Sequence, residues 1–239
     1  MKKLITAFTA LFVTFSLFSQ GTYEDLLIVK ADATWEKLIK KADKYTVKSS
    51  TSKDAEPYYY MAYGLYKISF EAERSEEFKN AYKESFTAIG KMLRYDKSGE
   101  IQSKYAEFID EMKFSLLEII QNEVDNEEYR RAFGWSMRLY KFGRTYIPAL
   151  YLEGALRSRN NDLTTARMKW NEGEKLLEEA DINSWSKADQ EIMMLALYQS
   201  ARALVDVRQV DSAIEVMKIG APYFEENKIW QERYNEIVN

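Results

Sequence analysis

The sequence contains no cysteine and no histidine. A chain without these residues cannot form disulfide bonds, bind zinc through thiolate or imidazole, attach c-type haem, or use a thiol nucleophile or a histidine-based triad. Proline and glycine are also scarce, with three and nine residues among 239. The long uninterrupted stretches of Leu, Ala, Glu, Lys and Met favour helix. The composition therefore predicts an all-α fold and excludes most familiar catalytic chemistry.

Basic charge is in deficit as well, because 34 Lys and Arg face 38 Asp and Glu, for a net charge of −4. Nucleic-acid binding requires a basic patch. We expect no helix of this chain to carry an unopposed stripe of Lys and Arg, and therefore no nucleic-acid partner.

The longest apolar run lies at the start of the chain. Lys2 and Lys3 precede a run from Leu4 to Phe18 that only Thr and Ser interrupt. This layout is typical of a secretory signal peptide, and the run is shorter than the roughly 20 residues that a membrane-spanning helix needs. We therefore divide the chain into a signal peptide, 1–19, with Ser19/Gln20 as the best cleavage site, and one domain, 20–239. We predict a periplasmic protein without stable membrane insertion after cleavage, with secretion as the alternative.

Two segments of the second half share one spacing of small and large residues. In each, a Leu precedes a small residue by four, and Ala, a large residue and Gly follow at intervals of twelve, four and three. The positions are Leu150, Gly154, Ala166, Trp170 and Gly173, then Leu197, Ala201, Ala213, Met217 and Gly220. Steps of three and four keep residues on one helix face, so small residues mark where a second helix approaches closely. We expect Gly154 to meet Ala166, with Trp170 covering the rim of the contact.

This spacing resembles the signature of the tetratricopeptide repeat family, strongly over 148–225 and weakly over 55–144. The resemblance implies a right-handed α-solenoid of antiparallel helix hairpins. It also implies a concave face, lined by the first helix of each pair, that binds peptides or other proteins.

Apolar periodicity and polar breaks predict about ten helices, with a loop over 46–57. The first helix has the spacing of the second member of a pair, so we expect its partner to lie in the leader. The last helix carries an apolar stripe suited to sealing the other end of the stack. The predicted ranges are 23–46, 55–72, 75–95, 100–123, 126–142, 148–160, 162–180, 187–207, 210–224 and 227–238.

The resemblance implies partner-binding residues on the first helices of three units. They are Tyr58, Met61, Tyr151, Arg159, Tyr198 and Arg202. We expect Tyr151 and Tyr198 to be flat anchors and the two arginines to pair with acids of a partner, since Tyr and Arg are favoured at interfaces. In the alternative interpretation, either tyrosine packs against the next pair, and either arginine pairs with an acid of its own helix, Glu153 or Asp206.

The stretch 57–70 is the most aromatic helix, and it fits either burial between neighbouring pairs or a platform for a ligand. Two acid pairs, Glu123 with Asp125 and Glu178 with Glu179, are typical of solvated helix ends. Asn160 to Asp162 lacks the later oxygen ligands and the glycine of a calcium loop and predicts a helix cap instead.

We therefore predict an exported, non-enzymatic scaffold or adaptor that binds a segment of another envelope protein, with no cofactor and no metal. A helical glycan- or peptidoglycan-binding protein is the alternative. A glycan enzyme built on carboxylates is a third hypothesis.

Overall fold

Every regular element in residues 23–239, the part of the chain that the computed structural model describes, is a helix. The all-α prediction is thereby confirmed. The predicted leader and its cleavage site lie outside the described residues. Twelve α-helices are present in this part: α1 (Glu24–Ala31), α2 (Trp35–Val47), α3 (Ala55–Ile68), α4 (Ala81–Tyr95), α5 (Glu100–Lys104), α6 (Ala106–Asp125), α7 (Tyr129–Ser136), α8 (Ile147–Arg159), α9 (Leu163–Leu177), α10 (Lys187–Asp206), α11 (Val210–Phe224) and α12 (Lys228–Val238). Three short 3₁₀ helices accompany them: η1 (Glu76–Phe78), η2 (Leu139–Lys141) and η3 (Ile182–Ser184).

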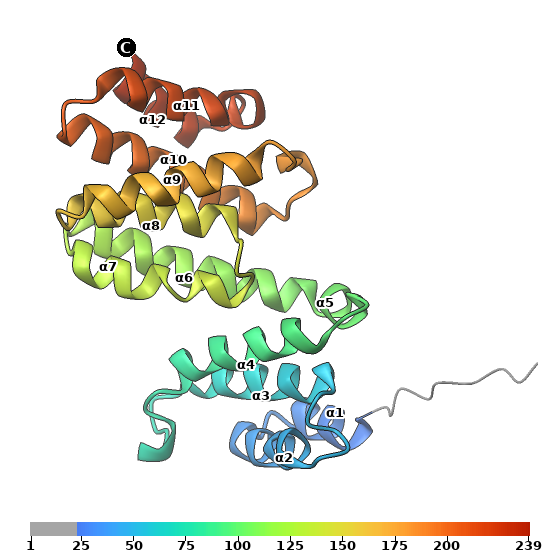
Figure 1. Cartoon of the computed structure of the whole chain (residues 1–239). Helices are drawn as coiled ribbons and strands as arrows, with labels where there is room; N and C mark the ends of the chain where they lie inside the picture. Colours follow the sequence, from blue (N-terminus) through green and yellow to red (C-terminus); the bar gives the residue numbers. More distant parts are fainter. Residues whose placement is uncertain (1–22) are drawn as a thin grey trace, which may run out of the picture.

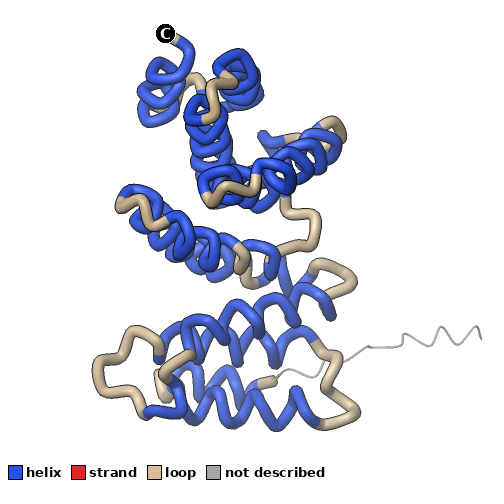
Figure 2. The backbone as a smooth tube through the Cα atoms, turned by 60° about the vertical axis from the view of Figure 1, so that its left-hand side comes forward, coloured by secondary structure: helices blue, strands red, loops and turns tan. Residues whose placement is uncertain are grey.

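The helices form an elongated stack that follows the order of the chain (Figure 1). Helices α1 and α2 lie at one end, and α11 and α12 lie at the other. Most helices contact the next helix of the chain, most extensively α3 with α4 and α8 with α9, and α8 also packs extensively against α10. Figure 2 shows the connecting loops at the edges of the stack, where they leave the helix faces free to pack.

Two predicted helices are each divided into two. The range 23–46 breaks between α1 and α2, because Ala33 has a left-handed φ of 52° that a continuous helix does not contain. The range 100–123 breaks at Tyr105, whose φ of −118° and ψ of 25° separate α5 from α6. The structure therefore has twelve α-helices in its described part rather than about ten.

The first break corrects the expectation that the first helix finds its partner in the leader. Helix α1 itself packs against α2, and both contact neighbours further along the stack. Leu26 and Val29 of α1 and Leu38 and Ala42 of α2 are buried. The apolar periodicity of 23–46 thus belongs to two short helices that cover each other.

Helices α8 and α10 are buried on nearly all sides. Helix α8 contacts α7, α9 and α10, and α10 contacts α6, α8, α11 and α12. A helix that is apolar around most of its circumference needs neighbours in several directions, and the centre of the stack supplies them. No helix within residues 23–239 combines the length and the apolar character needed to cross a membrane.

The small residues of the spacing do lie at close approaches between helices, but the contact partners differ from the expected ones. A Cβ placed on Gly154 would lie 2.4 Å from Nε1 of Trp170. The Trp170 indole therefore rests directly on Gly154 and is buried, rather than covering the rim of a contact between Gly154 and Ala166. A Cβ on Gly173 would lie 2.8 Å from the ring of Tyr151. Glycine provides room for an aromatic ring at both places.

A buried ion pair ties α6 to the start of α10. The Lys113 ammonium lies 2.7 Å from Asp189, and the Tyr146 hydroxyl donates a hydrogen bond to the same carboxylate. Ser186 donates to Asp110 and also caps α10 by accepting from the Asp189 N–H. A buried charge that is paired and hydrogen-bonded is strongly disrupted when one partner is removed. This network fixes the two halves of the stack relative to each other.

Candidate functional site

Three arginines and two tyrosines from four helices meet on one side of the stack. We call this group the arginine–tyrosine cluster, and with its two acids it consists of Tyr129, Arg159, Tyr198, Arg202, Asp206, Arg233 and Glu236. Spacings of four residues place Tyr198, Arg202 and Asp206 on one face of α10. The cluster unites three of the six residues that the sequence predicted for partner binding.

Arg159, the last residue of α8, is the most buried cation of the cluster. Its side chain is 8 % exposed, and its Nη1 donates a 2.5 Å hydrogen bond to the hydroxyl of Tyr129, whose ring lies 4.6 Å from the guanidinium. Nη2 lies 3.1 Å from Asp206 but is not aligned for a hydrogen bond, and Nε has no acceptor among residues 23–239. Part of the binding capacity of this guanidinium is therefore unused.

The remaining residues connect α10 to α12. The Tyr198 hydroxyl donates a 2.6 Å hydrogen bond to Glu236, and Nε of Arg202 lies 3.7 Å from the same carboxylate. The guanidinium of Arg233 lies 4.9 Å from the centre of the Tyr198 ring, and its Nη2 donates to Gln121 of α6. Arg202 is exposed, whereas Arg233 is half-buried. Tyr198 is thus enclosed by charged groups on both sides and is itself only 8 % exposed, so a partner would contact the arginines around it rather than its ring.

The pKa values of Arg202 in α10 and Arg233 in α12 shift in opposite directions. Burial lowers the pKa of Arg233, and the opposing influence of Tyr198 and nearby carboxylates is too small to reverse it. Burial also lowers the pKa of Arg202, but Tyr198 and Glu236 more than offset it, so the net shift is upward. Both remain cationic at neutral pH. With three arginines and two carboxylates, the cluster holds an excess of positive charge.

The other three predicted residues lie away from this cluster. The ring of Tyr151 is 2 % exposed and packs on Gly173, so it has no surface for a partner in this conformation and we exclude it from the site. Tyr58 is also buried, with its hydroxyl donating to the Ser52 carbonyl. Met61, a residue of α3, is half-buried and packs against the core. Whether any predicted residue binds a partner stays a prediction.

Tyr129, Arg233 and Glu236 complete the cluster and were not singled out in the sequence. The apolar stripe of α12 predicted only that this helix seals the end of the stack. Of that stripe, Trp230 alone is buried. Arg233 and Glu236 are three residues apart on that helix and hence on one face. That spacing was a usable signal, but only the packing of α12 on α10 shows what it faces.

Most tyrosines of the aromatic stretch 57–70 are buried and do not form a platform for a ligand. Tyr58, Tyr59, Tyr60 and Tyr66 of α3 are buried, and the Tyr59 ring stacks on Tyr105 with 3.3 Å between ring centres. Burial is thus the dominant role of these rings. Phe70, beyond the end of α3, is the exposed exception.

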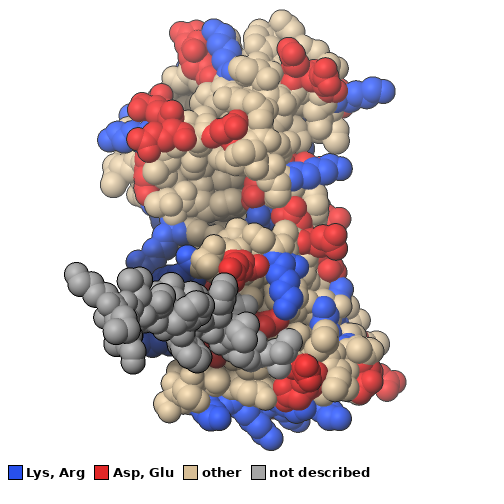
Figure 3. Space-filling view, turned by 90° about the vertical axis from the view of Figure 1, so that its right-hand side faces the viewer, with Lys and Arg blue, Asp and Glu red and all other residues tan. Residues whose placement is uncertain are grey.

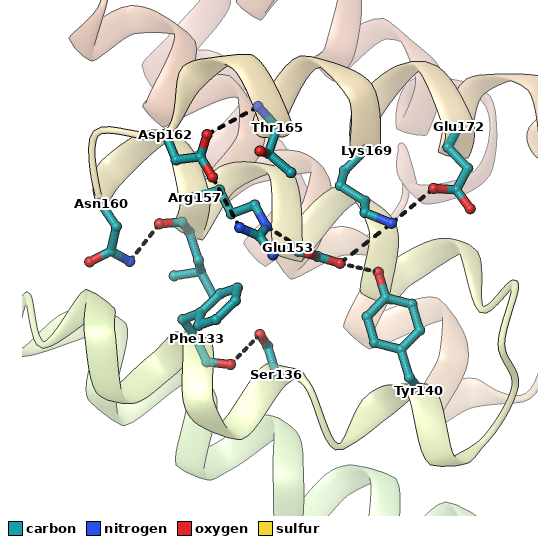
Figure 4. Close-up of polar contacts among 11 residues, drawn as sticks. Phe133, Ser136, Tyr140, Glu153, Arg157, Asn160, Asp162, Thr165, Lys169 and Glu172 are labelled. Carbon is teal, nitrogen blue, oxygen red and sulfur yellow. Dashed lines mark hydrogen bonds and ion pairs between the residues drawn. The ribbon is translucent and has the colours of Figure 1, made fainter.

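Glu153 is the most deeply buried carboxylate with several partners, and it joins three segments of the fold (Figure 4). It accepts hydrogen bonds from the Tyr140 hydroxyl at 2.5 Å and from Nε of Arg157 at 2.6 Å, and Lys169 lies 3.9 Å away. Nη1 of Arg157 donates a hydrogen bond to Asp162. The Asp162 carboxylate also accepts from the N–H of Thr165 and thereby caps α9, which confirms the predicted cap. A carboxylate enclosed by cations and a phenol stabilises packing and has no free side to face a substrate.

The pairs of acids considered for catalysis do not form a site. Glu123 is buried and paired with Arg131 at 2.9 Å, which occupies its carboxylate. Asp125, the last residue of α6, and Glu178, which follows α9, are both exposed. Within residues 23–239, no group of three or more acids is arranged to hold a metal ion.

No protein-family model matches the chain, and comparisons with curated proteins and with solved structures likewise find no match. The functional argument therefore rests on the chemistry of the site itself.

Proposed function

We propose that this protein is an exported, non-catalytic scaffold that binds an acidic segment of another envelope protein through the arginine–tyrosine cluster. In this proposal the successive helix pairs form a right-handed, tetratricopeptide-like solenoid, and the protein works in the periplasm or outside the cell. The observation that supports it most is the convergence of Arg159, Arg202 and Arg233 around two tyrosines, with Nε of Arg159 lacking an acceptor among the described residues.

The two acids of the cluster allow a partner to enter. Asp206 and Glu236 are both exposed, and ion pairs of exposed side chains contribute only about 0–1 kcal/mol each. A carboxylate of the partner can replace Glu236 beside the exposed Arg202, because the displaced acid returns to water at little cost. Arginine then offers two parallel N–H donors to the new carboxylate, the geometry that favours specific recognition.

The glycan alternative receives less support from the aromatic residues. Sugar rings stack on free aromatic faces, but here cationic side chains already cover several of them. Lys30 lies 4.3 Å from the centre of the Tyr63 ring, and Arg138 lies 4.5 Å from that of Trp135. These contacts favour protein recognition over carbohydrate stacking.

Affinity capture from solubilised envelopes, with the tagged mature protein as bait, tests the proposal. Replacement of an interface arginine typically costs about 1–4 kcal/mol of binding, so Arg202→Gln should lower the affinity for a specific partner about fivefold or more. Arg167→Gln is the matched control, since Arg167 is an exposed arginine of α9 outside the cluster. Equal capture by both variants would remove the cluster from the binding site. Turnover of peptidoglycan or oligosaccharides by the purified protein would contradict the non-catalytic part.

A further inference from the structure

The outer face of α2 carries lysines in a continuous patch. Helical spacing places Lys37, Lys40, Lys44 and Val47 on the side opposite the buried Leu38, Ile39 and Ala42. All four outer residues are exposed. Because α2 lies at the end of the stack (Figure 1), the only approach to this face that we find within residues 23–239 is that of η1, whose Glu77 and Phe78 lie beside Lys40.

Most of the positive charge on this face is not neutralised by neighbours. Lys37, Lys44 and Lys48 form no ion pair within the described part of the chain. Lys40 lies 3.8 Å from Glu36 and 3.6 Å from Glu77, distances at which exposed pairs contribute little. Only Lys41, turned toward α1, has a close partner, Asp25 at 3.0 Å.

This patch departs from the expectation of no unopposed basic stripe at Lys37 and Lys44 only, because Lys40 is opposed by Glu36 and Glu77. The break at Ala33 makes α2 a separate helix with its own outer face. The chain as a whole is acidic, in contrast to the lysine-rich outer face of α2. Figure 3 shows Lys and Arg side chains along the end of the molecule where Figure 1 places α1 and α2.

The same end of the stack exposes large aliphatic side chains. Leu27 and Ile28 of α1 are 53 % and 61 % exposed, and Val47 at the end of α2 is 72 % exposed. Val47 shares the outer face of α2 with Lys40 and Lys44. We call Leu27, Ile28, Lys37, Lys40, Lys44 and Val47 the α1–α2 end surface.

We propose that the α1–α2 end surface binds peripherally to a bilayer that contains anionic lipids. Lysines next to an anionic leaflet are attracted to its headgroup phosphates, and aliphatic side chains gain by leaving water at the headgroup–acyl boundary. A soluble polyanion matches the lysines but not Leu27, Ile28 and Val47. The combination of both chemistries at one free end of the stack therefore favours a membrane surface. Such binding is independent of the arginine–tyrosine cluster, so either proposal can fail alone.

Vesicle co-sedimentation of the mature protein tests this inference. We expect binding to vesicles that mix phosphatidylglycerol with phosphatidylcholine, and none to phosphatidylcholine alone. Each lysine near such a surface is worth roughly fivefold in affinity, so Lys37→Gln with Lys44→Gln should weaken binding roughly 25-fold. The control Lys187→Gln with Lys218→Gln removes the same charge from exposed lysines of α10 and α11 and should leave binding nearly unchanged.

A second pair of variants separates a bilayer from a soluble polyanion. Ile28→Ser with Val47→Ser keeps the charge of the surface, and it should lower vesicle binding several-fold while binding to polyphosphate stays the same. All these side chains are exposed, so the melting temperature should stay close to that of the wild type, which circular dichroism verifies. Equal loss in the two lysine variants, or vesicle binding unaffected by the aliphatic pair, would overturn the proposal.

Discussion

The α8–α9 and α10–α11 pairs share one spacing of small and large residues but fill it with different side chains. In the first pair, the Trp170 indole rests on Gly154. In the second, the equivalent positions hold Ala201 and Met217, both buried. Where the first helix has alanine, at Ala201, the second helix supplies the flexible side chain of Met217. Where the first helix has glycine, at Gly154, the second helix supplies a flat indole ring.

The two pairs also differ in the ring that packs on the last glycine of the spacing, Gly173 or Gly220. Gly173 accommodates the ring of Tyr151 from its own pair, whereas Gly220 accommodates Trp230 from α12, with 2.5 Å between an added Cβ and the ring. Tyr198, the counterpart of Tyr151, instead donates to Glu236 in the arginine–tyrosine cluster. Both tyrosines are buried, but the Tyr151 ring packs on a glycine of its own pair whereas the Tyr198 hydroxyl bonds to an acid of the following helix.

The comparison is tested most strongly by removing the two equivalent tyrosines. Tyr151→Ala should lower the free energy of unfolding by about 3–5 kcal/mol, since it leaves a cavity in the centre of the stack. Tyr198→Ala should cost about 2 kcal/mol, because the long arginine side chains beside it can collapse into the space. Chemical denaturation of both variants measures the difference, and equal losses would show that the tyrosines have one and the same role.

A methyl group on Gly154 tests whether glycine is required by the ring. Gly154→Ala should lower the free energy of unfolding by about 2–3 kcal/mol, because the rigid indole of Trp170 cannot yield as a flexible chain would. Combining it with Trp170→Met recreates the Ala–Met contact of the second pair. The double variant should be more stable than the sum of the two single losses predicts, as a double-mutant cycle from denaturation curves will reveal. Additive losses would mean that the two positions do not contact each other.

The two indoles differ in their hydrogen bonds. Nε1 of Trp170 donates to the Tyr151 carbonyl at 3.2 Å and to the Ser200 hydroxyl at 2.9 Å, whereas Nε1 of Trp230 has no partner within residues 23–239. Trp170→Phe should therefore cost about 2–3 kcal/mol and Trp230→Phe about 1 kcal/mol, the difference being the hydrogen bonds lost. Thermal unfolding followed by calorimetry compares them. A larger loss for Trp230→Phe would contradict this account.

The smallest expected effect concerns the caps of the two second helices. Asp162 caps α9, while Gln209 in front of α11 makes no side-chain cap. Gln209→Asp should therefore stabilise the protein by about 0.5–1 kcal/mol at neutral pH. Unchanged stability would indicate that water already provides hydrogen-bond acceptors for the first backbone N–H groups of α11.

The pH dependence distinguishes the charged cap from packing. Hydrogen bonds from Thr165, followed by the Arg157 interaction, lower the pKa of Asp162. A carboxyl whose pKa is lowered on folding stabilises the folded state above its unfolded pKa of about 3.9, and this contribution is lost as the pH falls below it. Asp162→Asn should thus lower the melting temperature at pH 7 but not at about pH 2. A difference that persists in acid would point to packing instead.

Periodicity in the sequence predicted the helices of the second half closely. The predicted range 210–224 coincides with α11, and 148–160 differs from α8 by one residue at each end. The cap at Asp162 was also predictable, because capping depends on residues within one turn. The breaks at Ala33 and Tyr105 were missed, since neither residue is a glycine or proline, the residues that usually mark a break in the sequence.

For the candidate site, local information identified three residues but not their surroundings. Arg159, Tyr198 and Arg202 follow from the repeat spacing, yet the same reasoning selected Tyr151, which is in the core. Spacing specifies the face of a helix and does not specify what covers it. Tyr129 and Arg233 come from α7 and α12, which only the packed structure brings to that face.

By itself, the sequence determined that this protein is helical, where most of its helices lie, and where small residues allow close approach, because these properties depend on neighbours a few residues apart. Tertiary structure decided that Gly154 takes an indole, that Tyr151 is core while Tyr198 faces arginines, and that α2 presents its lysines at a free end. These outcomes depend on contacts between residues far apart in the chain, whose energies are set by the side chains that meet and by the water they exclude.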